Sequence, residues 1–248
     1  MIDLLKLRLL QKNSVIRDIR NATLPERYRG FPEIKDTPCR ENCRVCADVC
    51  PTDAISRDPL RIDLGRCVFC PLCEEACPED IISFTNKCRL STDDRKSLIV
   101  TSQTSELNPS LASEKIRSYF GKSLKLRQIS AGGCNGCELE LNALSNVNFD
   151  MGRYGIEFAA SPRHADGIVI TGPITKNMAE ATEICYDAVP DPKIIILFGA
   201  CAISGGIFQN SGEIERKFLE EHKIDLYIPG CPPHPLTLIN GLLDLLGK

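Results

Sequence analysis

Residues 131–138 read Ala131-Gly-Gly-Cys134-Asn-Gly-Cys137-Glu138, and the rest of the chain is organised around this stretch. Asn135 and Gly136 tolerate positive φ, so the backbone can turn there and direct both sulfurs at one metal centre. A lone CxxC motif also occurs in zinc sites and in redox dithiols. The choice between these depends on the cysteine-rich segment before the stretch and on the alternating strand and helix patterns after it.

The composition bounds the class of protein. A chain of 248 residues can hold two domains, and its net charge of -3 argues against nucleic acid as a partner. The 14 cysteines are the anomaly. The first twenty residues have Lys6 and Arg8 inside their apolar stretch and no small-residue cleavage site, so we expect a reducing, cytoplasmic setting and metal ligation rather than disulfides.

No uncharged apolar run reaches the ~18 to 20 residues that spanning a bilayer requires. The nearest, residues 194–208, is interrupted by three glycines and is predicted to be a buried strand and loop. Residues 1–20 suit a basic amphipathic helix, lying either on a partner or membrane surface or on its own domain. Prolines at 25, 32 and 38 predict an extended strap after it.

Two cysteine runs follow. The second, Cys67-x2-Cys70-x2-Cys73-x3-Cys77-Pro78, has the spacing of bacterial ferredoxins, in which three close thiolates hold one cluster and the cysteine before proline reaches the other. The first, Cys39-x3-Cys43-x2-Cys46-x3-Cys50-Pro51, has one extra residue, which we expect to bulge the loop without losing the ligand. The pattern predicts crossed ligation of two 4Fe-4S clusters, cluster 1 by Cys39, Cys43, Cys46 and Cys77, and cluster 2 by Cys67, Cys70, Cys73 and Cys50.

The repeat extends beyond the cysteines, because Pro51-Thr-Asp-Ala-Ile55 is echoed by Pro78-Glu-Asp-Ile-Ile82. This duplication predicts a two-fold pseudo-symmetric α+β ferredoxin domain in residues 1–90. All-cysteine zinc sites use two separated CxxC knuckles, which fit two tight runs closed by proline poorly. Cys88 lies outside both runs and is expected to be a spare buried thiol.

Residues 91–122 change in composition to Ser, Thr, Asp and Lys and are predicted to be a linker with a short helix over 111–120. Residues 123–248 then alternate between strand and helix patterns, which predicts an α/β domain with a parallel sheet. The expected strands are 124–129, 156–159, 168–171, 194–198 and 226–228, and the expected helices are 138–144, 178–188, 214–222 and 236–246.

The remaining cysteines fall just after predicted strands. Open parallel sheets bind ligands at the carboxyl ends of their strands, so these side chains should converge. The sequence therefore predicts a third 4Fe-4S cluster, cluster 3, held by Cys134, Cys137, Cys201 and Cys231. Cys185 lies within a predicted helix and is expected to be a core cysteine.

The second half resembles the small subunit of energy-converting NiFe-hydrogenases and the related B-type subunit of complex I, which have an α/β flavodoxin-like fold. The resemblance rests on these segments: Gly133-Cys-Asn-Gly-Cys-Glu138, Ser161-Pro-Arg-His-Ala-Asp166, Thr171-Gly-Pro-Ile-Thr-Lys-Asn-Met178, Gly199-Ala-Cys-Ala and Pro229-Gly-Cys-Pro-Pro233. The first half resembles the two-cluster ferredoxin subunit of the same complexes. The separated cysteines 134 and 137, together with His164, favour hydrogenase over complex I, whose subunits have adjacent cysteines and tend to have glutamine.

The resemblance implies an oxidoreductase subunit that relays electrons between a donor, such as ferredoxin or a formate- or CO-oxidising module, and a nickel-iron site in a partner large subunit. It implies further electron-transfer and membrane subunits and a peripheral place on the inner face of the cell membrane. A quinone- or sulfur-reducing complex and a zinc-binding scaffold are the alternatives. Glu138 is either a proton relay or a helix N-terminal stabiliser. His164 is expected to be structural, Arg163 to meet the partner, and His234 to stand where relatives often have arginine.

Overall fold

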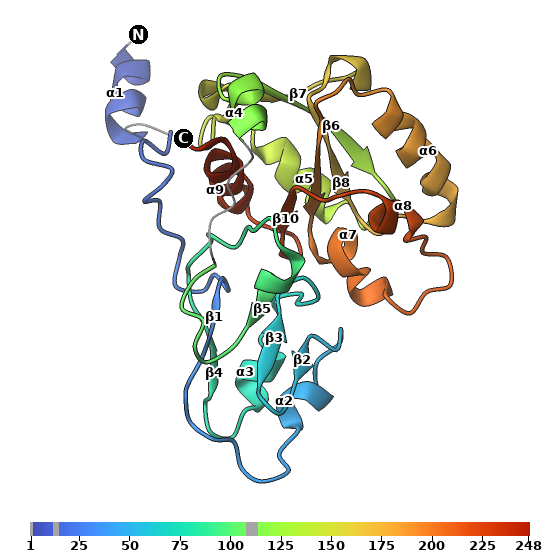
Figure 1. Cartoon of the computed structure of the whole chain (residues 1–248). Coiled ribbons are helices and arrows are strands. Elements are labelled where there is room, and N and C mark those ends of the chain that lie inside the picture. The colour runs from blue at the N-terminus through green and yellow to red at the C-terminus, as the bar shows by residue number, and fades with distance from the viewer. Residues whose placement is uncertain (1, 12–14, 108–113) are drawn as a thin grey trace.

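A computed structural model describes residues 2–11, 15–107 and 114–248, which form two lobes and a separate N-terminal helix (Figure 1). The first lobe contains two short antiparallel sheets. One pairs β1 (Pro32–Ile34) with β4 (Ile82–Phe84), and the other has the order β2-β3-β5, with β2 at Ile55–Ser56, β3 at Arg61–Asp63 and β5 at Ile99–Val100. Helices α2 (Val45–Asp48) and α3 (Leu72–Ala76) complete this lobe.

The internal duplication is visible in the backbone. Asn42 and Phe69, each directly before the second cysteine of its run, have φ of 56° and 55°. Asp53 and Asp80, in the segments after the two prolines, have φ of 50° and 48°. Both pairs are 27 residues apart in the sequence, as are the starts of α2 and α3. The predicted two-fold pseudo-symmetric module is therefore present.

The second lobe is built on five parallel strands in the order β10-β9-β8-β6-β7. Taken in chain order this is the 2-1-3-4-5 arrangement of flavodoxin-like folds, whose switch point here lies between β6 and β8. β8 and β9 are buried along their whole length, as expected for central strands covered on both faces. The strands are β6 (Leu124–Ser130), β7 (Ile156–Phe158), β8 (Gly167–Thr171), β9 (Ile194–Phe198) and β10 (Leu226–Ile228).

Helices cover both faces of this sheet. α9 (Pro235–Leu246) is apolar and buried almost throughout, because it lies between the sheet, α4 and α5. The other helical elements are α4 (Glu114–Phe120), α5 (Gly136–Ala143), α6 (Lys176–Asp187), α7 (Ala200–Ser204) and α8 (Lys217–Glu221), with 3-10 turns η1 (Arg95–Leu98), η2 (Met151–Tyr154), η3 (Pro162–His164) and η4 (Gly206–Phe208).

The predicted linker, residues 91–122, also forms contacts with both lobes. β5 adds a third strand to the first lobe, and Thr92 forms an isolated antiparallel bridge with Tyr227 of β10, with N···O distances of 3.2 and 2.8 Å. Arg95 then binds Asp63 through two hydrogen bonds of 2.8 and 2.7 Å. One buried core continues from Phe31 and Ile62 in the first lobe into the second. The lobes are therefore fastened to each other.

Three local predictions need correction. The strap contains a strand, β1, because Pro32 can begin an edge strand that pairs with β4. The helix predicted over 214–222 is helical only in α8, since Ile214 instead bridges Thr175. α7 was not predicted. Of the helix predicted over 111–120, residues 111–113 lie outside the described residues and the remainder is α4.

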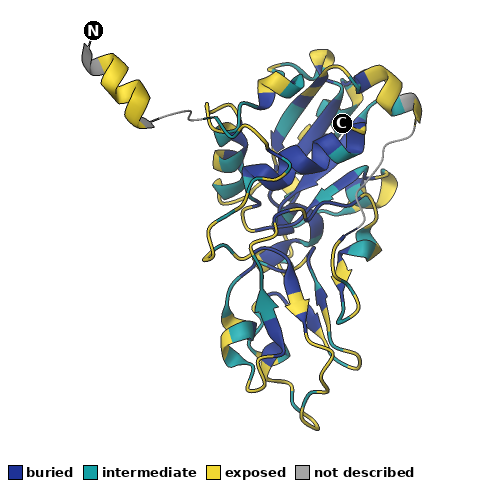
Figure 2. Ribbon diagram, turned by 90° about the vertical axis from the view of Figure 1, so that its left-hand side faces the viewer, coloured by how far each residue is buried: buried dark blue, intermediate teal, exposed yellow. Residues whose placement is uncertain are grey.

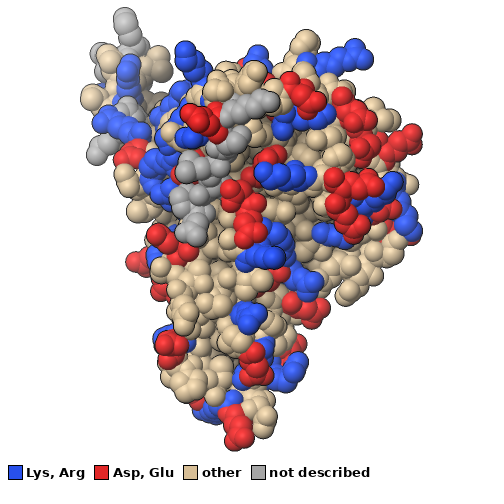
Figure 3. All heavy atoms as spheres, in the orientation of Figure 1, with Lys and Arg blue, Asp and Glu red and all other residues tan. Residues whose placement is uncertain are grey.

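Helix α1 (Ile2–Gln11) stands away from both lobes, and Leu9 and Leu10 are 77% and 81% exposed (Figures 1 and 2). Packing on its own domain, one of the two predictions for this segment, is not the arrangement seen. None of the helices in the described part of the chain has the length and apolar character that crossing a bilayer requires. Acidic and basic side chains are interspersed over the face shown in Figure 3.

Candidate metal centres

Two cavities in the first lobe are lined by cysteines. Both are narrow. The cysteines of the first are Cys39, Cys43, Cys46 and Cys77. The cysteines of the second are Cys50, Cys67, Cys70 and Cys73. The structure thus brings together the same two sets that crossed ligation requires. Each set takes three cysteines from one repeat and the proline-flanked cysteine from the other.

Backbone amides point at three of these sulfurs. Ala54 N donates to Cys50 Sγ and Ile81 N to Cys77 Sγ, each at 3.3 Å and each from four residues further along the chain. Phe69 N donates to Cys67 Sγ at 3.3 Å. Such donors stabilise the negative charge of a thiolate. The positive φ at Asp53 and Asp80 allows the chain to fold back over Cys50 and Cys77 in this way.

The thiols of each set also raise one another's pKa values, because their charges repel. Burial, followed in effect by the neighbouring charges of Cys70 and Cys50, raises the pKa of Cys73 to about 12. Burial likewise raises the pKa of Cys46, with Cys39 and Cys77 next in effect. Four such thiols can be thiolates together only beside a strong positive charge, which a bound metal centre supplies. The chemistry of both donor sets therefore fits a metal centre.

The third set lies at the carboxyl edge of the parallel sheet. Cys134 and Cys137 follow β6, Cys201 follows β9, and Cys231 follows β10. Burial raises the pKa of Cys201 to about 11, and Cys231 and Cys134 are the next causes. Burial, Glu138 and the other three cysteines raise the pKa of Cys137 as well. The four thiols predicted to bind cluster 3 are thus electrostatic neighbours.

Glycines make room for two of these sulfurs. Gly199 has φ of 99°, and a Cβ there would come within 2.7 Å of Cys137 Sγ. Gly206 has φ of 53°, and its Cβ would lie 2.9 Å from Cys201 Sγ. The backbone therefore approaches the sulfurs more closely than any residue with a side chain allows.

Within the described residues, no three His, Cys, Asp or Glu side chains lie close enough together to hold a single metal ion.

Glu138 sits at the switch point of the sheet. Its Oε1 accepts hydrogen bonds from Ser130 Oγ and Thr171 Oγ1, both at 2.7 Å, and these residues end β6 and β8. Burial opposes ionisation, but the hydrogen bonds from Thr171 and Ser130 outweigh it and lower the pKa of Glu138. Its Oε2 is buried and has no hydrogen-bond partner among the described residues. An ionised carboxylate thus ties the cysteine loop to two strands.

A cleft between the lobes joins the second and third cysteine sets. It has a volume of about 330 Å³, and Cys70 and Cys231 both line it. These two thiols are close enough that Cys70 contributes to raising the pKa of Cys231, after burial and Cys134. Arg29, in the strap, donates from Nε to the carbonyl of Phe69 at 2.7 Å and so holds the cysteine loop at the cleft. The second set therefore adjoins the third, and it is joined to the first because each of these two sets takes one cysteine from the other's repeat, so the three sets form a series.

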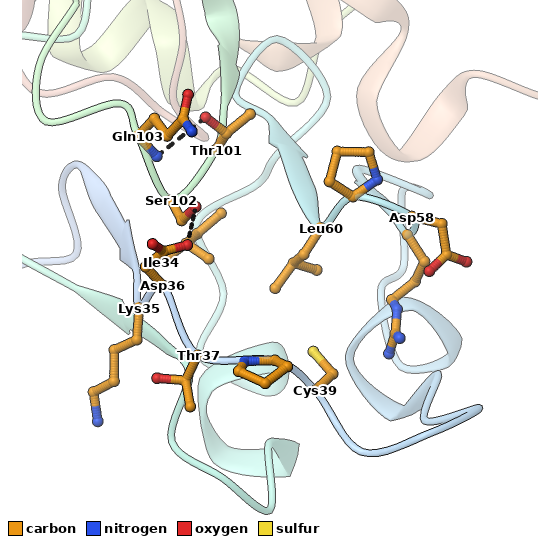
Figure 4. A pocket seen from close by; sticks show the side chains of 13 residues that line it. Ile34, Lys35, Asp36, Thr37, Cys39, Asp58, Leu60, Thr101, Ser102 and Gln103 are labelled. Carbon is orange, nitrogen blue, oxygen red and sulfur yellow. Dashed lines mark hydrogen bonds between the residues drawn. The ribbon is translucent and has the colours of Figure 1, made fainter.

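The first set borders a pocket of about 570 Å³ on the outside of the first lobe, formed by residues 34–39, 57–60 and 101–103. Leu60 and Cys39 point into it, and Ser102 donates a hydrogen bond of 3.2 Å to Asp36 on its wall (Figure 4). At the opposite end of the series, Cys134 and Cys231 are exposed. The series thus reaches the surface at both ends.

Comparison with known proteins follows this division of the chain. Residues 134–245 match the family described as NADH ubiquinone oxidoreductase, 20 kDa subunit, and residues 38–81 match the 4Fe-4S dicluster domain. The probable membrane-bound hydrogenase subunit mbhJ of Pyrococcus furiosus is 35% identical over 130 residues, which are 52% of this chain and 78% of that relative. The chain belongs to the NADH ubiquinone oxidoreductase 20 kDa subunit family.

Other members of the family align over the same half. Formate hydrogenlyase subunit 7 of Escherichia coli is 40% identical over 51% of this chain and 49% of its own length. The B-type subunit of the NADH-quinone oxidoreductase of Citrifermentans bemidjiense is 43% identical over 45% of this chain and 65% of its own length. The chain thus spans from half to two thirds of these two relatives. The predicted fold class is confirmed, and the chain is an oxidoreductase subunit with an added 4Fe-4S dicluster domain.

Several residues singled out in the sequence have other surroundings. Arg163 and His164 are exposed in η3. His234 accepts a hydrogen bond from Leu236 N through Nδ1 at 3.1 Å and so caps α9, and burial lowers its pKa. Cys88 is buried, as expected of a spare thiol. Cys185 is half-buried in α6 beside Arg127.

Sequence reasoning missed Ser130, which carries no signal of its own although it stands at the end of an apolar run. Thr171 belongs to a segment that carries the family resemblance, but its hydrogen bond to Glu138 was not foreseen. Arg57, in the wall of the first cavity, could have been found by aligning the two repeats.

Proposed function

We propose that this chain is the electron-transfer subunit of a multi-subunit, membrane-associated NiFe-hydrogenase. In this proposal three 4Fe-4S clusters connect a low-potential donor with a nickel-iron site in a partner large subunit. The single observation that carries it is the series of cysteine sets, in which Cys70 and Cys231 line one cleft. The hydrogenase subunits among the relatives support the choice of complex.

The proposed ligand sets are those predicted from the sequence. Cluster 1 is held by Cys39, Cys43, Cys46 and Cys77, cluster 2 by Cys67, Cys70, Cys73 and Cys50, and cluster 3 by Cys134, Cys137, Cys201 and Cys231. Bound clusters of this type each take up and release one electron, over a wide range of potentials. All-cysteine zinc sites use two separated CxxC knuckles, whereas these two runs are tight and each is closed by proline, which favours clusters over the zinc scaffold.

The chain's own residues hold and separate these sites. Amides of Ala54 and Ile81 stabilise thiolate charge at the crossed ligands Cys50 and Cys77. Glu138 holds the loop of Cys134 and Cys137 against two strands. Because its pKa is lowered, the carboxylate stays ionised at neutral pH, which favours the structural role over the proton relay.

The two ends of the series define two docking faces. The cluster 3 end is proposed to meet the large subunit, because Cys134 and Cys231 are exposed there and the adjoining η4 presents Ile207, which is 58% exposed. The pocket beside Cys39 is proposed to be the place where a donor such as ferredoxin, or a formate- or CO-oxidising module, approaches (Figure 4). The complex would lie on the inner face of the cell membrane.

A second candidate is the equivalent subunit of a quinone-reducing complex. It is favoured by the 43% identity with the B-type subunit of an NADH-quinone oxidoreductase. The separation of Cys134 from Cys137 by two residues, where complex I subunits have adjacent cysteines, favours hydrogenase. The position of the cluster 3 end is the same in both proposals, so the partner's metal distinguishes them.

The test is the nickel content of the complex purified without oxygen through a tag on this chain. One nickel per chain, in a co-purifying large subunit, together with hydrogen evolution from a reduced dye, is expected. Ile207→Asp should lose the nickel-containing partner, whereas Ile184→Asp, at an equally exposed position on α6, should keep it. A complex with full iron, a large subunit and no nickel would refute the hydrogenase and support the quinone-reducing candidate.

A further inference from the structure

The two cluster sites of the first lobe differ in one position of the internal repeat. Ile55-Ser56-Arg57 in the first repeat corresponds to Ile82-Ser83-Phe84 in the second, at the same offset of 27 residues that relates the cysteines. The flanking structure is the same, since β2 and β4 occupy equivalent places. An arginine and a phenylalanine thus stand at symmetry-related points of a module that is otherwise duplicated.

Arg57 lies in the wall of the cluster 1 cavity. It lines this cavity together with Cys39, Cys46 and the other two cysteines. Its Nη1 is buried and has no hydrogen-bond partner among the described residues, so this donor remains available to an acceptor bound in the cavity. The unused donor fits a sulfur acceptor of the cluster itself.

Phe84 does not take this place in the second cavity. It packs against Phe69, with ring centroids 6.1 Å apart. The wall of the cluster 2 cavity contains no charged residue within the part of the chain that the structure describes. Besides its cysteines it is formed by Pro51, Thr52, Ala54, Ile55, Ile62, Val68 and Leu72.

The other charges around the first cavity do not cancel Arg57. Arg40 and Glu79, which also line it, form an ion pair with each other. Asp58 interacts with Arg57 but is exposed, so water and salt weaken its effect. A buried nitrogen close to the sulfurs is screened much less. One positive charge therefore remains directed at the cluster 1 site.

We infer that Arg57 raises the reduction potential of cluster 1. Reduction adds a negative charge to a cluster, and a fixed positive charge a few ångströms away stabilises the reduced form. The inference rests on the proposed cluster binding by Cys39, Cys43, Cys46 and Cys77. In the complex, Arg57 makes the outermost cluster a stronger acceptor than it would be without this charge, which favours capture of an electron from a donor at the adjoining pocket.

The test is a redox titration of the purified holo-chain, followed by electron paramagnetic resonance. Arg57→Met should move one reduction wave to lower potential by a tenfold change in the reduction equilibrium or more, and tenfold is 59 mV for one electron. The other two waves should stay in place. Arg57→Lys should recover part of the shift, because it keeps the charge and loses the planar fork. Arg61→Met removes the same charge from an exposed position of β3 and should move no wave.

Asp58→Asn provides a test in the opposite direction that leaves the wall of the cluster 1 cavity unchanged. Asp58 has φ of 63°, which asparagine tolerates, and loss of its carboxylate should raise the same wave. The inference is overturned if Arg57→Met and Asp58→Asn leave every wave in place, or if Arg61→Met causes an equal shift. Iron and sulfide are measured on each sample. A full complement with unmoved waves refutes this inference alone, whereas wild-type protein without clusters refutes the proposed function.

Discussion

The space that Gly199 leaves for Cys137 is the sharpest steric constraint on cluster 3. Gly199→Ala would place a Cβ 2.7 Å from Cys137 Sγ, where real Cβ atoms essentially never lie. Gly199 also has φ of 99° and ψ of 155°, a region adopted almost only by glycine, and a side chain there costs about 1 to 3 kcal/mol. Relief of the overlap costs a similar about 1 to 3 kcal/mol. We therefore expect a loss of about 2 to 6 kcal/mol in the free energy of unfolding.

The variant should also lose cluster 3 selectively, because the overlap displaces one of its four ligands. Iron per chain should fall by about four, while clusters 1 and 2 keep their spectra. Gly212→Ala is the matched control, since a Cβ there meets nothing within 4 Å and its φ is ordinary. Urea unfolding and iron analysis on the two variants decide the matter. Gly199→Ala protein with full iron and wild-type stability would refute the proposed packing of Cys137.

Three further predictions concern His234, the lobe contact and the separation of the cysteine sets. His234 is half-buried with a lowered pKa, so its contribution to stability is complete above pH 6.5 and is lost as the pH falls through its folded pKa. His234→Asn keeps a cap acceptor worth about 1 kcal/mol and should flatten the dependence of thermal stability on pH between pH 7 and 5, so an unchanged slope would contradict this. Arg95→Met should lower the free energy of unfolding by about 1 to 3 kcal/mol, because it removes both hydrogen bonds to Asp63. A double-mutant cycle with Asp63→Asn, measured by urea unfolding, should show strong coupling, and additive effects would argue against a shared contact. Cys137→Ser should reduce iron by about four per chain and Cys185→Ser should not, so equal losses would disprove the assignment of cluster 3.

Long apolar runs made the second lobe predictable. Residues 194–198 and 226–228 are strands with the bounds read from the sequence. The first is a central strand, which needs apolar side chains on both faces. The convergence of Cys134, Cys201 and Cys231 followed from the same reasoning, since parallel strands place their carboxyl ends at one edge. Crossed grouping in the first lobe followed from cysteine spacing alone.

Features that depend on distant partners were not predictable from local pattern. Ile214 looked helical, but its bridge with Thr175 decides its conformation. Pro32 argued against a strand, yet β4 provides the pairing on the edge that proline leaves free. Ser130 and Thr171 meet at Glu138 only because β6 and β8 are neighbours in the sheet.

The most direct test of the central claim is the iron, acid-labile sulfide and zinc content of this chain, isolated without oxygen from its native source. Three 4Fe-4S clusters predict about twelve irons and twelve sulfides per chain, with no zinc. About eight irons and eight sulfides per chain would mean that cluster 3 is absent and that the series ends at the cleft between Cys70 and Cys231. A colourless chain with zinc and no sulfide would contradict the electron-transfer role altogether.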